Sequence, residues 1–317
     1  MDRGTSSPKR KVILVGPNGR PSMRGVVENM STDVELIFCS KNGNNYRIVD
    51  GKRRLLEADF NIEDAVVIRW GCAKLFPSNK RTISYNKARQ IQVASNKAES
   101  RRMFQAFGVP SPELIESDLQ ARIFLSNQDS LVVTRPTHHR GGKDFYIFGD
   151  YKDWRNLMNE NRGSNRGWYT SAFVNKDREF RVHCAHGKVL LTREKAPPKE
   201  FQEVWNRDST ESFRVVKWDE YKEDPTIKVA TNACLRAIES LGLDMGGVDV
   251  MIKDGVPYVL EVNTAPTLAS SKLATEKWAK YFDLLFSSDQ RREHWDYSVF
   301  KRGRSLIWKN FQLEEYV

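Results

Sequence analysis

The sequence has few cysteines, no long apolar run and no internal repeat, and each absence argues against a class of protein. The cysteines are scattered without a Cys-x-x-Cys motif, which predicts reduced thiols rather than a disulfide framework or a zinc site: Cys39, Cys72, Cys184 and Cys234. No apolar run approaches the ~20 residues that a bilayer-spanning helix needs. The first eleven residues have no apolar core behind their charges, unlike a signal peptide. We therefore expect a cytoplasmic protein with no membrane partner.

The 317-residue chain is strongly basic, with a formal net charge of +10. This charge fits an acidic partner such as a nucleotide, a nucleic acid or an acidic peptide, and it fits equally an enzyme that binds phosphates locally. The length predicts two or three lobes. The basic, aromatic segment from Asp289 onward can either bind nucleic acid or pack onto the body of the protein, and packing is favoured.

The most informative stretch, residues 246–266, reads as two apolar strands joined by a tight Asp-Gly turn. Asp249 lies on the first strand, while Glu261 and Asn263 are two residues apart on one face of the second. A two-residue loop alone would send Asp249 to the opposite face. We expect an odd-length loop or a bulge instead, because two carboxylates and an amide that converge suit a hard cation such as Mg²⁺.

An ordinary hairpin with its polar residues in water is the alternative interpretation of this stretch. The runs Val-Asp-Val-Met-Ile and Tyr-Val-Leu-Glu-Val-Asn argue against it, because they resemble core strands. An unpaired carboxylate is costly in such a setting. The sequence alone therefore favours the metal site.

Basic residues that suit phosphate lie on other segments. A predicted hairpin at residues 131–148 has a tip with Gly141, Gly142 and Lys143, where backbone N–H groups can approach phosphate oxygens; an ordinary exposed tip is the alternative. A second predicted hairpin carries Arg181 and Arg193 on facing strands. Two converging guanidinium groups suit a phosphate or an acyl phosphate, and surface arginines on a half-exposed sheet are the alternative.

A capped helix adds another cation to these segments. Asn96 and Glu99 form a capping-box pattern, which predicts that a helix starts at Lys97. Taken in order, the segments resemble the ATP-grasp superfamily, and within it the RimK-like carboxylate–amine ligases. The resemblance covers about residues 92–285. It is strongest at residues 248–268, where the two strands are similar to the family's magnesium hairpin.

The resemblance implies a mixed α/β and α+β architecture, the ATP-grasp fold. In that fold an N-terminal α/β domain precedes two α+β lobes that clamp a nucleotide. We accordingly expect an N-terminal domain, a central lobe, a C-terminal lobe with the metal site and a basic aromatic tail, at residues 1–92, 93–170, 171–288 and 289–317 respectively.

The resemblance also implies cofactors and site residues. The cofactors would be ATP and Mg²⁺, with Mn²⁺ as an alternative metal, and Asp249, Glu261 and Asn263 would hold the metal. Arg181 and Arg193 would contact the γ-phosphate and the acyl intermediate. The ATP-binding set would be Lys97, Arg135, Gly141, Gly142, Lys143, Phe173, Val174 and Glu179, with the backbone of Phe173 and Val174 at adenine and Glu179 at the ribose.

Three positions depart from the family pattern. Arg135 stands where a lysine is usual, Ala172 where an acidic residue is common beside adenine, and Gly247 where some dipeptide ligases have an arginine. The Arg-Pro sequence and the paired histidines that follow it are similar to often viral members of the family. These departures leave the substrates unspecified.

The activity implied by the resemblance is ATP-dependent ligation of a carboxylate and an amine. The carboxylate attacks the γ-phosphate to give an acyl phosphate and ADP, and the amine then displaces phosphate to form an amide. Two alternatives stay open: an ATP-grasp kinase, and a non-catalytic nucleotide-binding module with a protein or nucleic-acid partner. The sequence is compatible with an oligomer.

Overall fold

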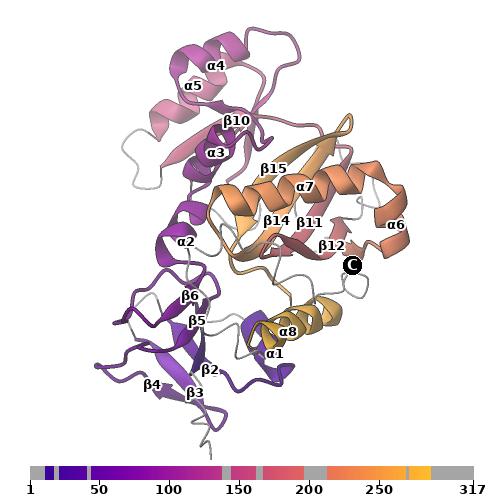
Figure 1. Cartoon of the computed structure of the whole chain (residues 1–317). Coiled ribbons are helices and arrows are strands. Elements are labelled where there is room, and N and C mark those ends of the chain that lie inside the picture. The colour runs from indigo at the N-terminus through magenta and orange to yellow at the C-terminus, as the bar shows by residue number, and fades with distance from the viewer. Residues whose placement is uncertain are drawn as a thin grey trace, which may run out of the picture. The chain divides into compact units, whose positions relative to one another are not determined.

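The structure is a computed structural model, and it describes residues 11–17, 21–40, 44–137, 144–161, 167–195, 213–268 and 271–286. The chain divides into two compact units. One comprises the chain up to Ile91 together with the segment from Ala265 onward, and the other is Gln92–Thr264 (Figure 1). The finer division into three domains and a tail stays a prediction.

The first unit contains a six-stranded sheet in the order β4-β3-β2-β1-β5-β6. Its strands are β1 (Val12–Pro17), β2 (Glu35–Cys39), β3 (Tyr46–Val49), β4 (Lys52–Leu55), β5 (Val66–Arg69) and β6 (Ile83–Tyr85). β1 pairs in parallel with β2 and β5, and helix α1 (Pro21–Glu28) connects β1 to β2. This βαβ arrangement gives the sheet a parallel centre, and β3 and β4 extend it in antiparallel pairing at one edge.

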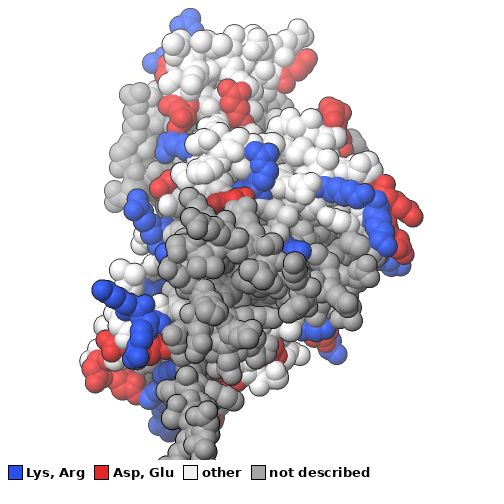
Figure 2. All heavy atoms as spheres, viewed as in Figure 1, with Lys and Arg blue, Asp and Glu red and all other residues white. Residues whose placement is uncertain are grey.

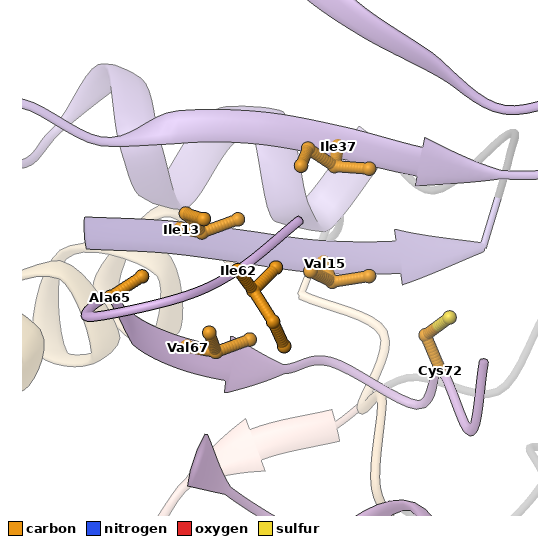
Figure 3. Close-up of a cluster of buried hydrophobic side chains, with 7 residues drawn as sticks. All are labelled: Ile13, Val15, Ile37, Ile62, Ala65, Val67 and Cys72. Carbon is orange, nitrogen blue, oxygen red and sulfur yellow. The ribbon is translucent and has the colours of Figure 1, made fainter. Parts of the chain in front are cut away.

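The central parallel strands β1 and β5 are buried along almost their whole length, as expected for strands that are covered on both faces. On one face, side chains from β1, β2 and β5 form a buried cluster with the segment around Ala65; its members are Ile13, Val15, Ile37, Ile62, Ala65, Val67 and Cys72 (Figure 3). Elsewhere in this unit Trp70 packs edge-on against Trp278 of helix α8 (Lys272–Phe286), with 5.1 Å between ring centroids. The last described helix therefore helps to complete the core of the first unit.

The second unit contains a four-stranded sheet in the order β7-β10-β8-β9. Its strands are β7 (Leu114–Ile115), β8 (Val132–Pro136), β9 (Tyr146–Phe148) and β10 (Trp168–Ala172), and the nearby helices are α3 (Lys97–Ala106), α4 (Asp118–Phe124) and α5 (Tyr151–Glu160). Helix α2 (Ala88–Ser95) precedes them in the chain. Asn96 caps α3 by accepting a 3.2 Å hydrogen bond from the Glu99 N–H, which confirms the predicted helix start at Lys97.

A five-stranded antiparallel sheet follows in the same unit, in the order β13-β12-β11-β14-β15. Its strands are β11 (Arg178–Ala185), β12 (Lys188–Lys195), β13 (Phe213–Val215), β14 (Met245–Lys253) and β15 (Val256–Asn263). Helix α6 (Trp218–Glu223) leads into α7 (Pro225–Ser240), which runs across this sheet in Figure 1. In none of the described segments is a helix both long and apolar enough to cross a membrane.

A glycine allows α7 and the hairpin to pack closely. A Cβ at Gly246 would lie 3.1 Å from the carbonyl oxygen of Asn263 and 3.2 Å from Cδ1 of Ile238 on α7. These distances are shorter than most carbon contacts in proteins, so a side chain at this position would push the strands and the helix apart. Gly246 thus helps to fix the end of β15, where Asn263 lies.

Candidate functional site

The β14–β15 hairpin brings the three predicted metal ligands together. Its turn has two residues, Asp254 and Gly255, both with positive φ, as a type I′ turn requires. The strand pairing shifts by one residue beyond the turn: Val250 pairs with Val259, whereas Asp249 pairs with Glu261, so Leu260 has no partner in this register. The extra residue in β15 is a bulge, so the predicted bulge is confirmed and an odd-length loop is not needed.

The bulge places the metal-capable side chains on one face of the sheet. The side-chain amide of Asn263 donates a 2.9 Å hydrogen bond to Glu261 Oε1, and the same nitrogen lies 3.5 Å from Asp249 Oδ2. A different register would have separated these groups, because shifting the pairing by one residue reverses the face of every side chain.

Two cations bind the carboxylates of this group. The guanidinium of Arg181 on β11 donates from Nε and Nη2 to the two oxygens of Asp249, at 2.7 Å and 2.8 Å. The ammonium of Lys97, at the start of α3, lies 2.9 Å from Glu261 Oε2. We call these five residues, Lys97, Arg181, Asp249, Glu261 and Asn263, the charge cluster.

The charge cluster is shielded from water to different degrees. The side chain of Asp249 is 4% exposed, that of Lys97 11%, and those of Arg181 and Glu261 about a quarter or less. The negative charge of Asp249 raises the pKa of Arg181, so this guanidinium stays charged. Two cations balance two anions, which keeps the buried carboxylate of Asp249 compensated.

The donor atoms of the charge cluster fit a hard divalent cation. Carboxylate and amide oxygens are the ligands that Mg²⁺ and Mn²⁺ take from proteins. Among the described residues, no group of three or more His, Cys, Asp and Glu side chains is arranged to hold a metal. A cation here would therefore depend on the amide of Asn263 as well as on Asp249 and Glu261.

The predicted ribose residue, Glu179, is buried on β11. It lies two positions before Arg181, hence on the same face of the strand, and its charge contributes to the raised pKa of Arg181. Two lysines surround its carboxylate: Lys176 forms an ion pair with it, and Lys195 Nζ lies 3.5 Å from the same oxygen. Neither lysine was predicted from the sequence, although the spacing of three residues between Lys176 and Glu179 is a visible signal.

The remaining predicted residues lie outside the charge cluster as defined here. Arg135 is buried on β8, where its guanidinium lies over the ring of Phe145 at 5.2 Å. Arg193 on β12 is directly opposite Arg181, and burial together with that neighbouring charge lowers its pKa. Phe173 and Val174 follow β10, and the N–H of Phe173 donates to the carbonyl of Leu131 at 2.8 Å.

Three predicted ATP-binding residues, Gly141, Gly142 and Lys143, lie outside the described residues, and so does the basic aromatic segment from Asp289 onward. Lys and Arg are intermixed with Asp and Glu on the described part of the surface seen in Figure 2.

A buried histidine gives a pH-dependent prediction for the same strand. Burial lowers the pKa of His183 from its usual 6.5 to about 3, and the charges of Arg181 and Arg193 add to the effect. The unfolded chain therefore takes up a proton before the folded one, so the free energy of unfolding falls as the pH falls from 6.5 toward 3. We expect a contribution of about 1.4 kcal/mol per pH unit.

The measurement is urea denaturation at several pH values in this window, for the unaltered protein and for His183→Gln. Carboxylates titrate in both proteins, so the histidine accounts for the difference between the two slopes. We expect a shallower pH dependence in the variant; equal slopes would contradict the assignment of a neutral, buried imidazole.

Comparisons with known proteins identify the fold. No protein-family model matches the sequence, and no curated protein matches it significantly. Among solved structures, the VanG D-Ala:D-Ser ligase from Enterococcus faecalis has a TM-score of 0.62 at 12% identity, with 88% of this chain and 100% of that chain covered. A D-alanine–D-alanine ligase from Bacillus anthracis has 0.58 at 16% identity, covering 93% and 98%.

The ATP-grasp ligase PsnB, complexed with a phosphomimetic variant of a minimal precursor, Mg and ADP, has a TM-score of 0.59 at 14% identity, covering 88% and 99%. At these identities the likeness shows the fold alone. The chain has the ATP-grasp fold, which confirms the predicted fold class. The RimK-like subtype and the similarity to viral members stay predictions.

Proposed function

We propose that this protein is an ATP-dependent ligase that joins a carboxylate to an amine through an acyl phosphate. The observation that carries the proposal is the charge cluster, in which two carboxylates, an amide and two cations converge on one sheet face of an ATP-grasp fold. The structural neighbours support it, since they are a D-Ala:D-Ser ligase, D-alanine–D-alanine ligases and an ATP-grasp ligase bound to Mg and ADP.

In the proposed site Asp249, Glu261 and Asn263 hold Mg²⁺, or Mn²⁺ in its place. When bound, the ion supplies charge neutralisation for the triphosphate. Lys97 and Arg181 contact the phosphate oxygens, together with Arg135 and the 141–143 loop. Arg193 contacts the acyl phosphate. Phe173 and Val174 contact adenine through their backbone, and Glu179 accepts hydrogen bonds from the ribose.

The chemistry is phosphoryl transfer followed by acyl transfer. The substrate carboxylate attacks the γ-phosphorus and ADP leaves, so a C–O–P linkage forms while the bond to ADP breaks. The amine then adds to the acyl carbon, loses a proton and expels phosphate. Positioning and charge neutralisation by the site residues supply most of the rate enhancement. The substrates are a carboxylic acid and an amine, small or peptidic, and we propose a cytoplasmic reaction.

The reaction can be tested with cell extract as a source of acids and amines. We expect ATP- and Mg²⁺-dependent condensation products whose mass equals acid plus amine minus water, with one ADP released per product, by mass spectrometry. Asp249→Ala is the matched control and should form none. Failure to release ADP with any acid and amine of a broad panel, while nucleotide still binds, would favour a non-catalytic nucleotide-binding module.

Isotope transfer separates ligation from kinase activity. With the carboxylate labelled by ¹⁸O, ligation through an acyl phosphate leaves one labelled oxygen in the released phosphate. A kinase that phosphorylates a hydroxyl transfers no carboxylate oxygen. A phosphorylated product whose phosphoryl group carries no ¹⁸O, with ADP formed and no labelled phosphate released, would therefore replace the ligase assignment by the kinase.

A further inference from the structure

Each acid of the proposed metal site is bound to a cation of the proposed phosphate site. Arg181 holds both oxygens of Asp249, and Lys97 holds one oxygen of Glu261. These contacts join residues far apart in the chain, from α3, β11, β14 and β15. The groups that would bind the two ligands are therefore engaged with each other.

Burial makes either ligand unfavourable on its own. The side chain of Asp249 is 4% exposed, and a buried carboxylate that loses its bidentate partner is strongly destabilising. A phosphate that drew Arg181 away would leave Asp249 in that state. A cation that took Asp249 would likewise remove the bidentate partner of Arg181, while Arg193 stays directly opposite and Glu179 provides only a more remote negative charge.

We propose that the nucleotide and the divalent cation bind by exchange of ion pairs. The cation takes the carboxylates of Asp249 and Glu261, and the phosphate oxygens take the guanidinium of Arg181 and the ammonium of Lys97. Two ion pairs are given up and two new sets of opposite charges form, so no buried charge stays uncompensated. This inference rests on the proposed function and adds a selection rule to it.

In the absence of a bound metal ion, the carboxylates of Asp249 and Glu261 compete with phosphate for the side chains of Arg181 and Lys97. Metal-free nucleotide and free inorganic phosphate are then rejected, and the metal-bound nucleotide is accepted. Couplings between two ligands of this kind typically amount to about 5–150-fold in affinity. The site would thereby avoid occupation by nucleotide that lacks the ion needed for the chemistry.

The two ion pairs are unequal, which gives the exchange a recognisable pattern. The Arg181–Asp249 pair is bidentate and its acid is 4% exposed, whereas Lys97 Nζ lies 2.9 Å from one oxygen of Glu261, whose side chain is 22% exposed. Bidentate, desolvated pairs are the stronger ones. Neutralising Asp249 should therefore free more binding energy for phosphate than neutralising Glu261.

The test is the affinity for ATP in the presence of EDTA, measured by calorimetry. We expect Asp249→Asn to bind metal-free ATP at least about tenfold more tightly than the unaltered protein, within the usual range of couplings. Glu261→Gln should show a smaller gain. Glu160→Gln removes the same charge from an exposed position at the end of α5 and should stay within about twofold, as distant exposed charges are screened.

A mutant cycle separates exchange from simple repulsion. If Asp249 only repelled phosphate through space, Asp249→Asn would raise metal-free affinity equally in an Arg181→Met background. Exchange requires Arg181, so the gain should vanish there. If Arg181→Met does not fold, the cycle of Glu261→Gln with Lys97→Met gives the same comparison on the more exposed pair.

The affinity measurements distinguish a failure of ion-pair exchange from a failure of the proposed function. The exchange is overturned if the gain in affinity persists in the Arg181→Met or Lys97→Met background, or if neither acid variant gains affinity. Tight binding of ATP with Mg²⁺ in either case leaves the proposed function standing. Failure of the unaltered protein to bind ATP with or without Mg²⁺ overturns the proposed function itself. Circular dichroism of each variant confirms that it is folded before the affinities are compared.

Discussion

Glu261→Gln is expected to lower the rate of the proposed ligation by about 10²–10³-fold, because it removes one of the two negative charges that hold the metal. The substitution keeps the size of the side chain and its ability to accept from the Asn263 amide at 2.9 Å. The Lys97 ammonium that loses its ion pair is largely buried but can still donate to the glutamine oxygen, so we expect the free energy of unfolding to fall by about 1–3 kcal/mol. Activity should fall while the fold remains.

The measurements are amine-dependent ADP release and the denaturant midpoint. Glu160→Gln, which neutralises an exposed acid of the same unit, serves as the control and should retain activity. Near-normal turnover of Glu261→Gln, with the fold intact, would count heavily against a metal site on this hairpin. A higher concentration of Mg²⁺ should recover part of the activity if weaker metal binding is the cause.

Arg181→Met is expected to destabilise the second unit by about 3–5 kcal/mol, since it leaves the buried carboxylate of Asp249 without its bidentate partner. Methionine is of similar length and retains much of the apolar contact of the arginine stem. The loss of charge compensation is then the main effect. Urea denaturation in the presence of EDTA measures it without a metal that could take the place of Arg181.

Arg102→Met is the matched control for this substitution. Arg102 pairs with Glu116 at 2.6 Å, but their side chains are 59% and 44% exposed, so we expect a change of about 1 kcal/mol or less. Adding Asp249→Leu to Arg181→Met should recover most of the lost stability, because an apolar pair replaces the lone charge. A loss in Arg181→Met no larger than that in Arg102→Met would show that Asp249 needs no counter-charge.

Local sequence signals predicted the hairpin and the convergence of its three polar side chains. Alternation along the strands put Glu261 and Asn263 on one face. The chemical need for Asp249 beside them predicted an odd-length loop or a bulge, and the structure contains the bulge. The helix start at Lys97 followed from its cap. These features are determined within a few residues, which is why periodicity and capping rules can find them.

Contacts between distant segments could not be predicted in the same way. Arg181 was assigned to phosphate from its place on a predicted hairpin and from the resemblance, and in the structure it binds Asp249, 68 residues away. That contact depends on the register of three strands. A register shift at His183/Cys184 sets Arg181 directly opposite Arg193, and no local pattern in the sequence marks this irregularity.

The pairing of Glu179 with Lys195 has the same origin. Their positions on β11 and β12 follow from the shifted register, whereas a regular hairpin around the His186–Gly187 turn would have placed Glu194 opposite Glu179. The packing of α8 on the first unit, through Trp278 and Trp70, likewise joins segments about 200 residues apart. Hydrophobic periodicity shows that a helix has an apolar face and leaves open what covers it.

The contribution of α8 to the first unit has a consequence for synthesis on the ribosome. The chain emerges from its amino end, so the strands β1–β6 are made long before the helix that packs on Trp70. The second unit is one uninterrupted segment and can acquire its structure while translation continues, as contiguous domains commonly do. The first unit must await residues that follow the second unit in the chain, and a premature stop after Thr264 would leave Trp70 without its contact to Trp278.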